Sequence, residues 1–157
     1  VQVCLAIDDP RLDAAPRGSG LLVAPPTPTD ATPMTAKALT HYSHKWGWVR
    51  DDQPVHVLRV SYGRAGVPTP EPTLAAALRD ASVLLGVDLS EDAVRGHAVI
   101  HFDNSLPPQT PAHRVRVAAL AAAVAALPGL GVTGAWFAGT GLAAVLPHAE
   151  DVARRLA

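Results

Sequence analysis

An uncharged stretch in the second half of the sequence places the strongest constraint on how this chain can fold. No Asp, Glu, Lys or Arg occurs between Val117 and Ala149, and this run is longer than the ~20 residues that a transmembrane helix needs. However, much of it is alanine, and it is interrupted by Pro128-Gly129, Gly131, Gly134, Gly139, Gly141 and Pro147. Because proline and glycine break regular helices, the pattern favours a helix, a turn, a strand and a second turn over a membrane span.

The composition is typical of a globular domain with nearly balanced charge. The 157 residues include 13 Lys or Arg and 14 Asp or Glu, which gives a net charge of −1. This balance argues against nucleic acid or an anionic membrane as the main partner, since both attract a basic excess. With 48% hydrophobic and 17% charged residues the chain is not intrinsically disordered. The single cysteine, Cys4, excludes an internal disulfide and a CxxC motif.

Hydrophobic periodicity and local stop signals predict a mixed α+β chain. Strands are expected at Val1–Ile7, Leu21–Ala24, Thr35–Tyr42, Val55–Tyr62, Ala98–Phe102 and Val132–Ala138, the third and fourth pairing as a hairpin. Helices are expected from the N-cap Thr73 to Gly86, from Ala112 to Leu127 behind Thr110-Pro111, and from Leu142 to Ala157. The C-terminal part therefore predicts a helix–strand–helix arrangement, with an apolar strand covered on both faces.

Neither the histidines nor the nucleophilic residues form a recognisable metal-binding or catalytic motif. His41 and His44 lie three residues apart on an expected strand, which points them to opposite faces. His97 and His101 share a face but lie roughly 13 Å apart at ~3.3 Å per residue, too far for one zinc ion. Cys4 lies inside an apolar strand, where a small buried side chain is expected rather than a reactive thiolate. We therefore predict no metal site and identify no catalytic residue.

The strongest local signal is a glycine-rich segment from Gly134 to Val145. It is interpreted as a strand, a tight turn at Gly139-Thr140-Gly141 and the start of a helix. Glycines let a ligand approach the backbone, and the free amides of a helix N-terminus attract an anion or a carbonyl oxygen. A tight connection that needs glycines for packing alone explains the same residues, and the spacing is not the GxGxxG fingerprint of a first Rossmann unit.

Six short blocks occur in an order that matches one family. They are Gly18–Val23, Thr35-Ala36 through Ser43–Trp46, Leu58–Gly63, Leu106–Gln109 followed by His113, Leu127–Leu130 and Gly134–Val145. Together, over nearly the whole chain, they resemble the C-terminal part of oxygen-dependent protoporphyrinogen/coproporphyrinogen oxidase. That family consists of flavoproteins of haem biosynthesis in the flavin amine oxidase superfamily.

The resemblance implies a two-domain FAD-binding flavoprotein of which this chain is the last part. Residues 1–102 would belong to the porphyrinogen substrate-binding domain with its mixed sheet, and residues 112–157 would return to the FAD-binding domain as its closing strand and helix. In the family the closing glycine turn lies against the flavin. FAD contacts are therefore carried over to Thr140, Gly141 and Leu142, and secondarily to their neighbours Gly134, Ala135, Trp136 and Gly139.

The implied reaction is a stepwise oxidation of a porphyrinogen to a porphyrin, with FAD as cofactor and O₂ as electron acceptor. Coproporphyrinogen III is the favoured substrate, and protoporphyrinogen IX is the other choice. The propionates would need cationic partners, for which Lys45, Arg59 and Arg64 are candidates, although ordinary surface charges are the more common explanation of such residues. Leu39 and Tyr42 are candidates for lining the macrocycle pocket.

The chain departs from the family in one large respect. The N-terminal GxGxxG with its ribose-binding acid, the family's main FAD anchor, is absent. The chain alone is therefore expected to be inactive and to need the missing N-terminal part of the same protein. A cytoplasmic location is expected, while peripheral membrane association and homo-oligomer formation stay open. Two alternatives remain. The first is a stand-alone tetrapyrrole-binding module without redox activity. The second is another enzyme of the flavin amine oxidase type, which is disfavoured by the block Leu106–Gln109 followed by His113.

Overall fold

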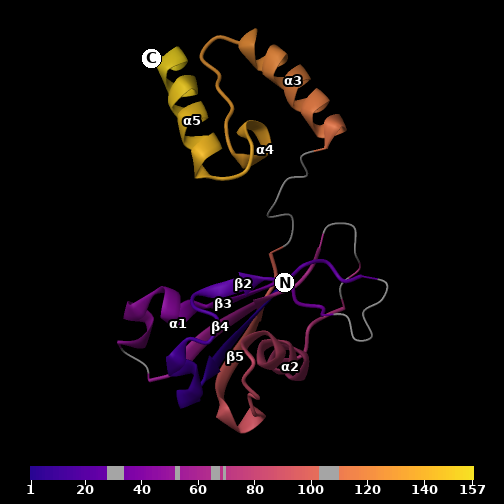
Figure 1. Cartoon of the computed structure of the whole chain (residues 1–157). Coiled ribbons are helices and arrows are strands. Elements are labelled where there is room, and N and C mark those ends of the chain that lie inside the picture. Colours follow the sequence, from indigo (N-terminus) through magenta and orange to yellow (C-terminus); the bar gives the residue numbers. More distant parts are fainter. Residues whose placement is uncertain (28–33, 52–53, 65–67, 69, 103–109) are drawn as a thin grey trace. The chain divides into compact units, whose positions relative to one another are not determined.

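The computed structural model describes residues 1–27, 34–51, 54–64, 68, 70–102 and 110–157. The chain divides into two compact units, Val1–Phe102 and Asp103–Ala157 (Figure 1). The first unit contains a sheet and one long helix, and the described residues of the second contain helices. The mixed α+β class predicted from the sequence is therefore confirmed.

A five-stranded sheet forms the first unit. Its strand order is β2–β3–β4–β1–β5, and every neighbouring pair is antiparallel. The expected pairing of the third and fourth strands is therefore confirmed, and the N-terminal strand lies inside the sheet. The bounds are β1 Gln2–Ile7, β2 Gly20–Leu22, β3 Ala38–His41, β4 His56–Ser61 and β5 Val94–Ile100.

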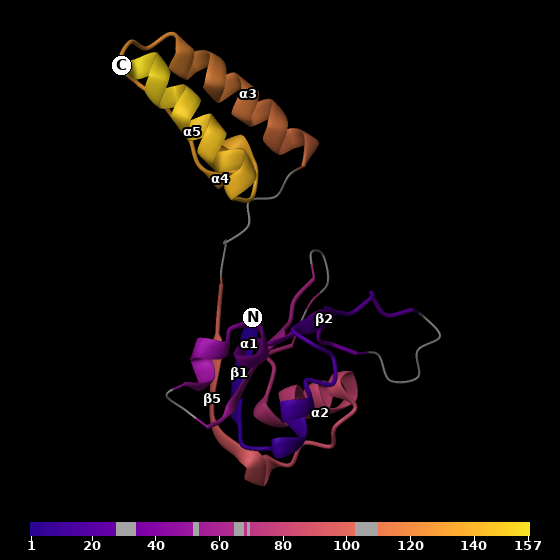
Figure 2. The same ribbon diagram turned by 60° about the vertical axis from the view of Figure 1, so that its left-hand side comes forward.

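Side-chain alternation decides which face of the sheet carries the core. Val3, Leu5 and Ile7 are fully buried, while the residues between them on β1 are only partly buried. Leu58 and Val60 continue the same buried face on β4. Helix α2, Leu74–Leu85, packs on this face (Figure 2), and its buried apolar residues in the core are Ala77, Leu78, Ala81 and Leu85.

Helix α2 begins and ends where the sequence predicts. Thr73 is the N-cap, and its Oγ1 accepts a hydrogen bond from the backbone amide three residues later at 3.1 Å. Gly86 ends the helix with φ 69°, a left-handed conformation that glycine adopts without strain. From the middle of the helix, the buried Asp80 carboxylate accepts hydrogen bonds from Thr35 Oγ1 at 2.9 Å and from the Ala36 amide at 3.2 Å. These bonds fasten the segment before β3 to α2.

The segment after β3 turns into helix instead of continuing as a strand. Strand β3 ends at His41, helix α1 occupies Tyr42–Lys45, and the short 3₁₀ helix η2 occupies Gly47–Arg50. The helical turn brings the His44 ring back toward His41, with 5.7 Å between ring centroids. The prediction that these two histidines point to opposite faces is therefore wrong, because residues three apart are neighbours on a helix. Two further 3₁₀ helices are η1 Pro10–Ala14 and η3 Glu91–Ala93.

Three helices make up the described part of the second unit. They are α3 Pro111–Ala125, α4 Ala135–Ala138 and α5 Leu142–Leu156. The predicted start of α3 is confirmed, since Thr110 Oγ1 accepts a hydrogen bond from the His113 amide at 3.1 Å and proline occupies the first turn. Among the described residues, no helix is long and apolar enough to cross a membrane.

The predicted strand from Val132 to Ala138 does not form. Residues 135–138 instead make the single helical turn α4, between Gly134 at φ 125° and Gly139 at φ 108°. A strand needs a partner for its backbone groups, and residues 110–157 contain no strand. The amides of Phe137 and Ala138 are instead satisfied locally by the Gly134 carbonyl, at 3.0 and 2.8 Å. The expected helix–strand–helix arrangement is therefore wrong.

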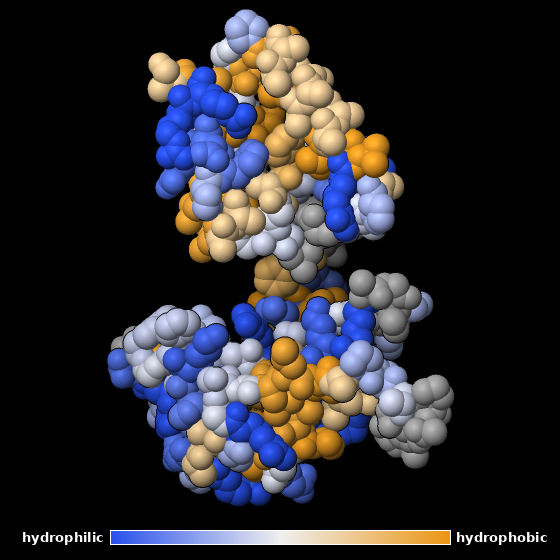
Figure 3. All heavy atoms as spheres, turned by 45° about the horizontal axis from the view of Figure 1, so that its top comes forward, coloured by the Kyte–Doolittle hydropathy of each residue, from blue (hydrophilic) through white to orange (hydrophobic). Residues whose placement is uncertain are grey.

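Much of the apolar surface of the second unit is exposed. Helix α3 buries none of its residues, and in α5 only Val152 is buried. Figure 3 shows apolar side chains over a large share of the visible surface of this unit. The exposed residues include Val115, Leu120, Leu127 and Leu130. Helices with such surfaces usually pack against another element.

Candidate functional site

The face of the sheet that points away from α2 carries the first candidate site. Side chains that alternate with the buried positions of β1, β3, β4 and β5 point to this face. The register aligns Thr40, Arg59, Cys4 and Ala98 in one row across the four strands. Arg59 is the only charged residue of this row, and its neighbours are small.

Arg59 lies beside an aromatic ring and has no partner for its buried nitrogen. Its guanidinium carbon is 5.8 Å from the centroid of the Tyr42 ring, a distance typical of a cation–π contact. Its Nε is buried and has no hydrogen-bond partner within the part of the chain that the structure describes. Burying an N–H group without an acceptor costs free energy, and a guanidinium is well suited to a carboxylate. This pair of residues is therefore a candidate anion site.

The other two predicted cationic residues make different contacts. Lys45 is exposed at the end of α1, with Nζ 5.7 Å from the centroid of the Trp46 ring. The Arg64 guanidinium donates hydrogen bonds to the carbonyls of Val23 at 2.8 Å and Ala24 at 3.3 Å. Arg64 therefore fastens the segment that follows β2, and a structural role accounts for its charge.

Leu39 belongs to the core and not to a pocket. Its side chain is 1% exposed and lies in the buried cluster beneath α2. The prediction placed Leu39 together with Tyr42, but alternation along β3 turns Leu39 to the covered face. Of the five predicted substrate residues, the structure thus brings together Tyr42 and Arg59.

The single cysteine is not activated. Burial raises the pKa of the Cys4 thiol, and the nearby Arg59 charge opposes this shift only in part. A thiol with a raised pKa stays protonated at neutral pH and is a poor nucleophile. The unreactive thiol agrees with the expectation from the sequence, but Cys4 is only partly buried and not fully buried as expected.

The second candidate site is the glycine-rich segment of the second unit, which carries the seven predicted flavin contacts. The N-cap of α5 is Gly141, which supplies no side-chain cap, and its carbonyl accepts the amides of Ala144 and Val145 at 3.1 Å. The amides that begin a helix have no intrahelical partner. The segment comprises Gly134, α4, residues 139–141 and the start of α5. Its predicted flavin contacts are Gly134, Ala135, Trp136, Gly139, Thr140, Gly141 and Leu142.

Glycines keep the backbone accessible at this segment. Gly139 and Gly141 have φ values of 108° and 97°, which residues with side chains rarely adopt. A Cβ at Gly141 would meet no heavy atom within 4 Å, and Thr140 and Leu142 are exposed. Open backbone beside the amides of a helix start fits an oxygen-rich edge such as a flavin carbonyl or a phosphate. The residues present therefore fit FAD.

Two histidines that the motif analysis did not assign hold this segment in place. His113 on α3 donates from Nε2 to the Trp136 carbonyl at 2.6 Å. His148 on α5 has its Nδ1 2.9 Å from Thr133 Oγ1, and its ring lies 5.3 Å from that of Phe137. His113 was noted in the sequence for its spacing from Leu106–Gln109, a block that lies outside the described residues. No local sequence signal links either histidine to these contacts.

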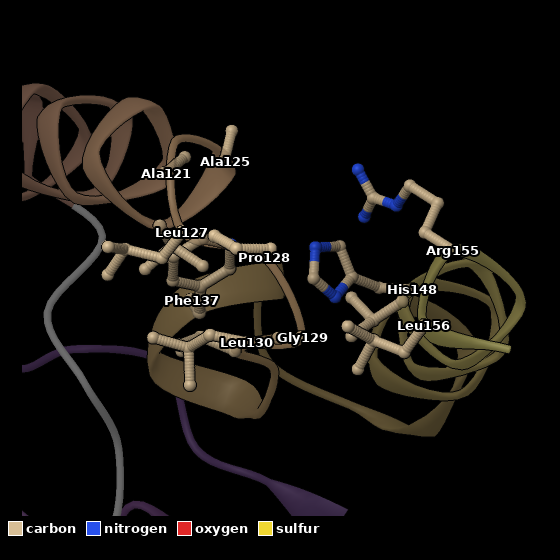
Figure 4. Close-up of a pocket in the computed structure, with 14 residues that line it drawn as sticks. Ala121, Ala125, Leu127, Pro128, Gly129, Leu130, Phe137, His148, Arg155 and Leu156 are labelled. Carbon is tan, nitrogen blue, oxygen red and sulfur yellow. The ribbon is translucent and has the colours of Figure 1, made fainter.

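A hollow of about 380 Å³ lies between α3, the segment that follows it and α5. In the close-up of Figure 4, the His148 and Arg155 side chains extend from α5 beside an otherwise apolar lining. None of the seven predicted flavin contacts lines this hollow. Its apolar lining includes Leu127, Pro128, Leu130, Phe137 and Leu156.

The histidines do not assemble a metal site in the described part of the chain. No group of three or more His, Cys, Asp or Glu side chains there is arranged to hold a metal ion. Strand β5 contains His97, and His101 follows its end, where Nε2 lies 3.0 Å from Glu71 Oε1.

The comparisons with known proteins concern the fold. No protein-family model and no curated protein matches the chain. The structure is similar to the crystal structure of a protein from Exiguobacterium sp. 255-15 that is provisionally named a protoporphyrinogen oxidase, with a TM-score of 0.67 and 24% sequence identity. The match covers 96% of this chain and 32% of that chain, so this chain spans about a third of the length of its structural neighbour. The two units of the chain thus have the fold of part of that protein.

Proposed function

We propose that this chain is part of an FAD-dependent oxidase that converts a porphyrinogen to the porphyrin, with coproporphyrinogen III as the first choice of substrate and protoporphyrinogen IX as the second. The observation that carries the proposal is the Arg59 guanidinium, which lies beside the Tyr42 ring on the face of the sheet opposite α2 and whose buried Nε has no hydrogen-bond partner among the described residues. A porphyrinogen offers both matching chemistries, since it combines a large apolar macrocycle with propionate carboxylates. The fold that this chain shares with part of the Exiguobacterium protein supports the same substrate class.

The residues of this chain would bind and orient rather than react. Arg59 would hold a propionate with two parallel N–H donors, and the Tyr42 ring would cover one side of that ion pair. In the second unit, the amides at the start of α5 would hold the cofactor, while His113 keeps the preceding turn in place through the Trp136 carbonyl. FAD, when bound, would accept the electrons and be reoxidised by O₂.

The substrate assignment is tested by binding of coproporphyrin III to the chain, followed by porphyrin fluorescence. A hydrogen bond to a charged group contributes about 1.5–3 kcal/mol, and about 1.4 kcal/mol is a factor of ten in affinity. Arg59→Gln is therefore expected to weaken binding by about tenfold or more. The matched control is Arg95→Gln, because Arg95 lies on the same sheet, where its charge already pairs with Asp8 at 2.9 Å.

The tetramethyl ester of coproporphyrin III separates the carboxylate from the macrocycle. The ester is expected to bind wild type and Arg59→Gln equally, since it has no charge for Arg59 to pair with. Equal binding of the free acid by wild type and Arg59→Gln would overturn the proposed role of Arg59. Weaker binding by Arg95→Gln of the same size would show a general charge effect and would overturn it as well.

The cofactor assignment is tested on the coding sequence upstream of Val1. An in-frame segment that encodes a strand, a GxGxxG turn and a helix would supply the main anchor for FAD. A start codon directly before Val1 would overturn the oxidase for this chain. Porphyrin binding without the anchor would then favour a tetrapyrrole-binding module without redox activity.

A further inference from the structure

The sheet of the first unit ends in a long strand with an uncovered outer side. Strand β5 is last in the strand order, and β1 is its only partner among the strands that the structure describes (Figure 1). Every residue of β5 after Val94 is exposed. Two of them are the large apolar residues Val99 and Ile100, each 38% exposed. The sheet therefore presents an apolar edge along β5.

The hydrogen bonds of β1 show which of its backbone groups point to β5. Before the strand begins, the Val1 carbonyl accepts a hydrogen bond from the Tyr62 amide beyond β4, at 2.9 Å. Backbone groups along an antiparallel strand alternate between its two neighbours, so the even-numbered residues of β1 point theirs to β5. The Asp8 amide agrees with this alternation, because it donates to the Ala93 carbonyl just before β5 at 2.8 Å.

The same alternation identifies the free backbone groups of the edge. Cys4 is paired with Ala98, so the amide and carbonyl of Ala98 point to β1. The neighbouring residues His97 and Val99 therefore point theirs outward, where no described strand bonds to them. Such groups are a template for another strand, and natural edges are often blocked by lysine, proline or a bulge. Strand β5 contains neither lysine nor proline, and its one pairing irregularity lies at its start, before Gly96.

Strand β5 is complementary to itself in an antiparallel register centred on Ala98. In this register Ala98 faces the same residue of a second copy, His97 faces Val99, and Gly96 faces Ile100. The outward groups of His97 and Val99 then meet, and each such pair exchanges both of its backbone hydrogen bonds. The central pair is one without hydrogen bonds, in which the two Cα atoms approach to ~4.5 Å. Alanine has a side chain small enough for this approach.

The side chains and charges also match in this register. Ile100 would lie over Gly96 of the second copy, where an added Cβ meets no atom within 4 Å and the space is open. Val99 would pack against the His97 ring as a directly opposite pair. Arg95 pairs with Asp8 at 2.9 Å and lies outside the central positions 96–100. No two charged side chains therefore face each other within these positions.

Other registers fit less well, and this one gives a closed assembly. A centre at His97 would oppose the two imidazoles and place Arg95, at the pairing irregularity, opposite Val99. A centre at Val99 would pair His97 with His101, beyond the end of the strand. With the two-fold axis at Ala98, both copies use the same edge, so that pairing leaves no second β5 edge uncovered.

We propose that β5 is an interface between two copies of this chain, in which the strands pair antiparallel about Ala98 and join the two sheets into one. The pairing needs no ligand, so the inference is independent of the proposed function. The row that contains Arg59, Cys4 and Ala98 continues across the axis, which places the two Arg59 residues on one face of the joined sheet. Five strand spacings of ~4.8 Å separate them, or roughly 24 Å.

The oligomeric state is tested by sedimentation velocity over a range of protein concentrations. The mass of the wild type is expected to rise from that of the 16.3 kDa chain toward twice that value. Ala98→Lys places two like charges opposite each other at the axis and is expected to stay monomeric. The matched control is Val83→Lys, because Val83 is 63% exposed on α2, and it is expected to dimerise like the wild type.

Three results would overturn the interface. The first is a wild type that is monomeric at every concentration. The second is a dimer that Ala98→Lys retains, since the contact would then lie on another surface, such as the exposed apolar side chains of the second unit. The third is an equal loss of the dimer in Ala98→Lys and Val83→Lys, which would be a general effect of charge.

A charge exchange tests the register itself. Ala98→Glu alone is expected to be monomeric for the same reason as Ala98→Lys. An equimolar mixture of the two variants is expected to form a heterodimer, because opposite charges then face each other at the axis. Ala98 is exposed, so both variants are expected to keep the far-ultraviolet dichroism of the wild type. A mixture that stays monomeric would overturn the Ala98 register.

A disulfide tests the register without a charge on the edge. A distance of ~4.5 Å between Cα atoms lies within the range of a disulfide. In a Cys4→Ser background, Ala98→Cys is therefore expected to form a covalent dimer on mild oxidation, seen on a non-reducing gel. The control Val83→Cys in the same background is expected to form far less. Equal cross-linking of the two proteins would overturn the register, even if the charged variants do not fold.

Two measurements separate this interface from the alternatives. If the coding sequence upstream of Val1 encodes a longer protein that is monomeric, a segment of that protein covers β5, and the interface between copies is overturned. Arg59→Gln is expected to dimerise like the wild type, because Arg59 lies two strands from the edge. A chain that dimerises through Ala98 but binds no coproporphyrin III would refute the proposed function and support the interface.

Discussion

Asp80 offers a stability test in which the structure supplies the magnitude. Its side chain is 2% exposed, and its Oδ2 accepts hydrogen bonds from Thr35 and from the Ala36 amide. Ala36 is fully buried, so its amide would have no water to replace the lost acceptor. The second oxygen lies 3.2 Å from a nitrogen of Arg79, a largely exposed side chain that adds little.

Asp80→Ala is expected to lower the free energy of unfolding of the first unit by about 2–4 kcal/mol. An unsatisfied buried donor costs about 1–3 kcal/mol, and loss of a hydrogen bond to a charged group costs a comparable amount. Both estimates count the loss of the same acceptor, so their sum is an upper limit for the loss of free energy of unfolding. Asp80→Asn retains a side-chain oxygen that can accept from the Ala36 amide, and we expect it to cost about half as much.

The assay is urea unfolding at pH 7, followed by the fluorescence of Trp46 and Trp48 in the Trp136→Phe background. Asp88→Ala is the matched control, because Asp88 follows the same helix with an exposed side chain, and surface substitutions usually change stability by less than about 0.5 kcal/mol. If Asp80→Ala costs no more than Asp88→Ala, the reasoning from the buried acceptor is refuted. Equal losses for Asp80→Ala and Asp80→Asn would refute the assigned role of the side-chain oxygen.

Three further predictions follow from single contacts. The pKa of His41 is about 4 in the folded chain against an ordinary 6.5, so the unfolded state binds a proton more readily as the pH falls. The first unit should therefore lose about 3 kcal/mol of its free energy of unfolding between pH 6.5 and pH 4, measured by urea titrations. An unchanged free energy of unfolding would contradict a neutral buried His41 ring. Gly20→Ala should destabilise the same unit by at least about 1 kcal/mol, because Gly20 has a φ of +138° and an added Cβ would lie 2.3 Å from the Leu39 carbonyl oxygen. The control Gly96→Ala on β5 should be tolerated, since a Cβ there would meet no atom within 4 Å. Thr110→Ala should destabilise α3 by about 1 kcal/mol through loss of its N-cap, measured as a lower helical dichroism on heating. Thr110→Ser keeps a hydroxyl at the N-cap and should retain the helical dichroism of the wild type. Equal helicity in the wild type and both variants would contradict the assigned N-cap.

The sequence determined the elements whose signals are local. The ends of α2 and the start of α3 follow from Thr73, Gly86 and Thr110-Pro111, which act on backbone groups within one turn. Alternation of apolar residues was enough to predict the strands of the first unit, with errors of a few residues at their ends. The glycine-rich segment was found for the same reason, since glycine and helix-start preferences are written in neighbouring residues.

The tertiary structure decided the properties that depend on residues far apart in the chain. Residues 132–138 have the composition of a strand, but a strand needs a partner, and the described part of the second unit offers none. Alternation alone does not tell which face of the sheet α2 covers, so the burial of Leu39 and the position of the Arg59 row on the opposite face followed only from the packing of α2. Likewise, residue spacing could not predict that the His41 ring lies 2.9 Å from the ring of His56, fifteen positions later, because the segment between them, which includes α1 and η2, sets that distance. Short-range preferences fix local shape, whereas burial and pairing are fixed only when distant segments meet.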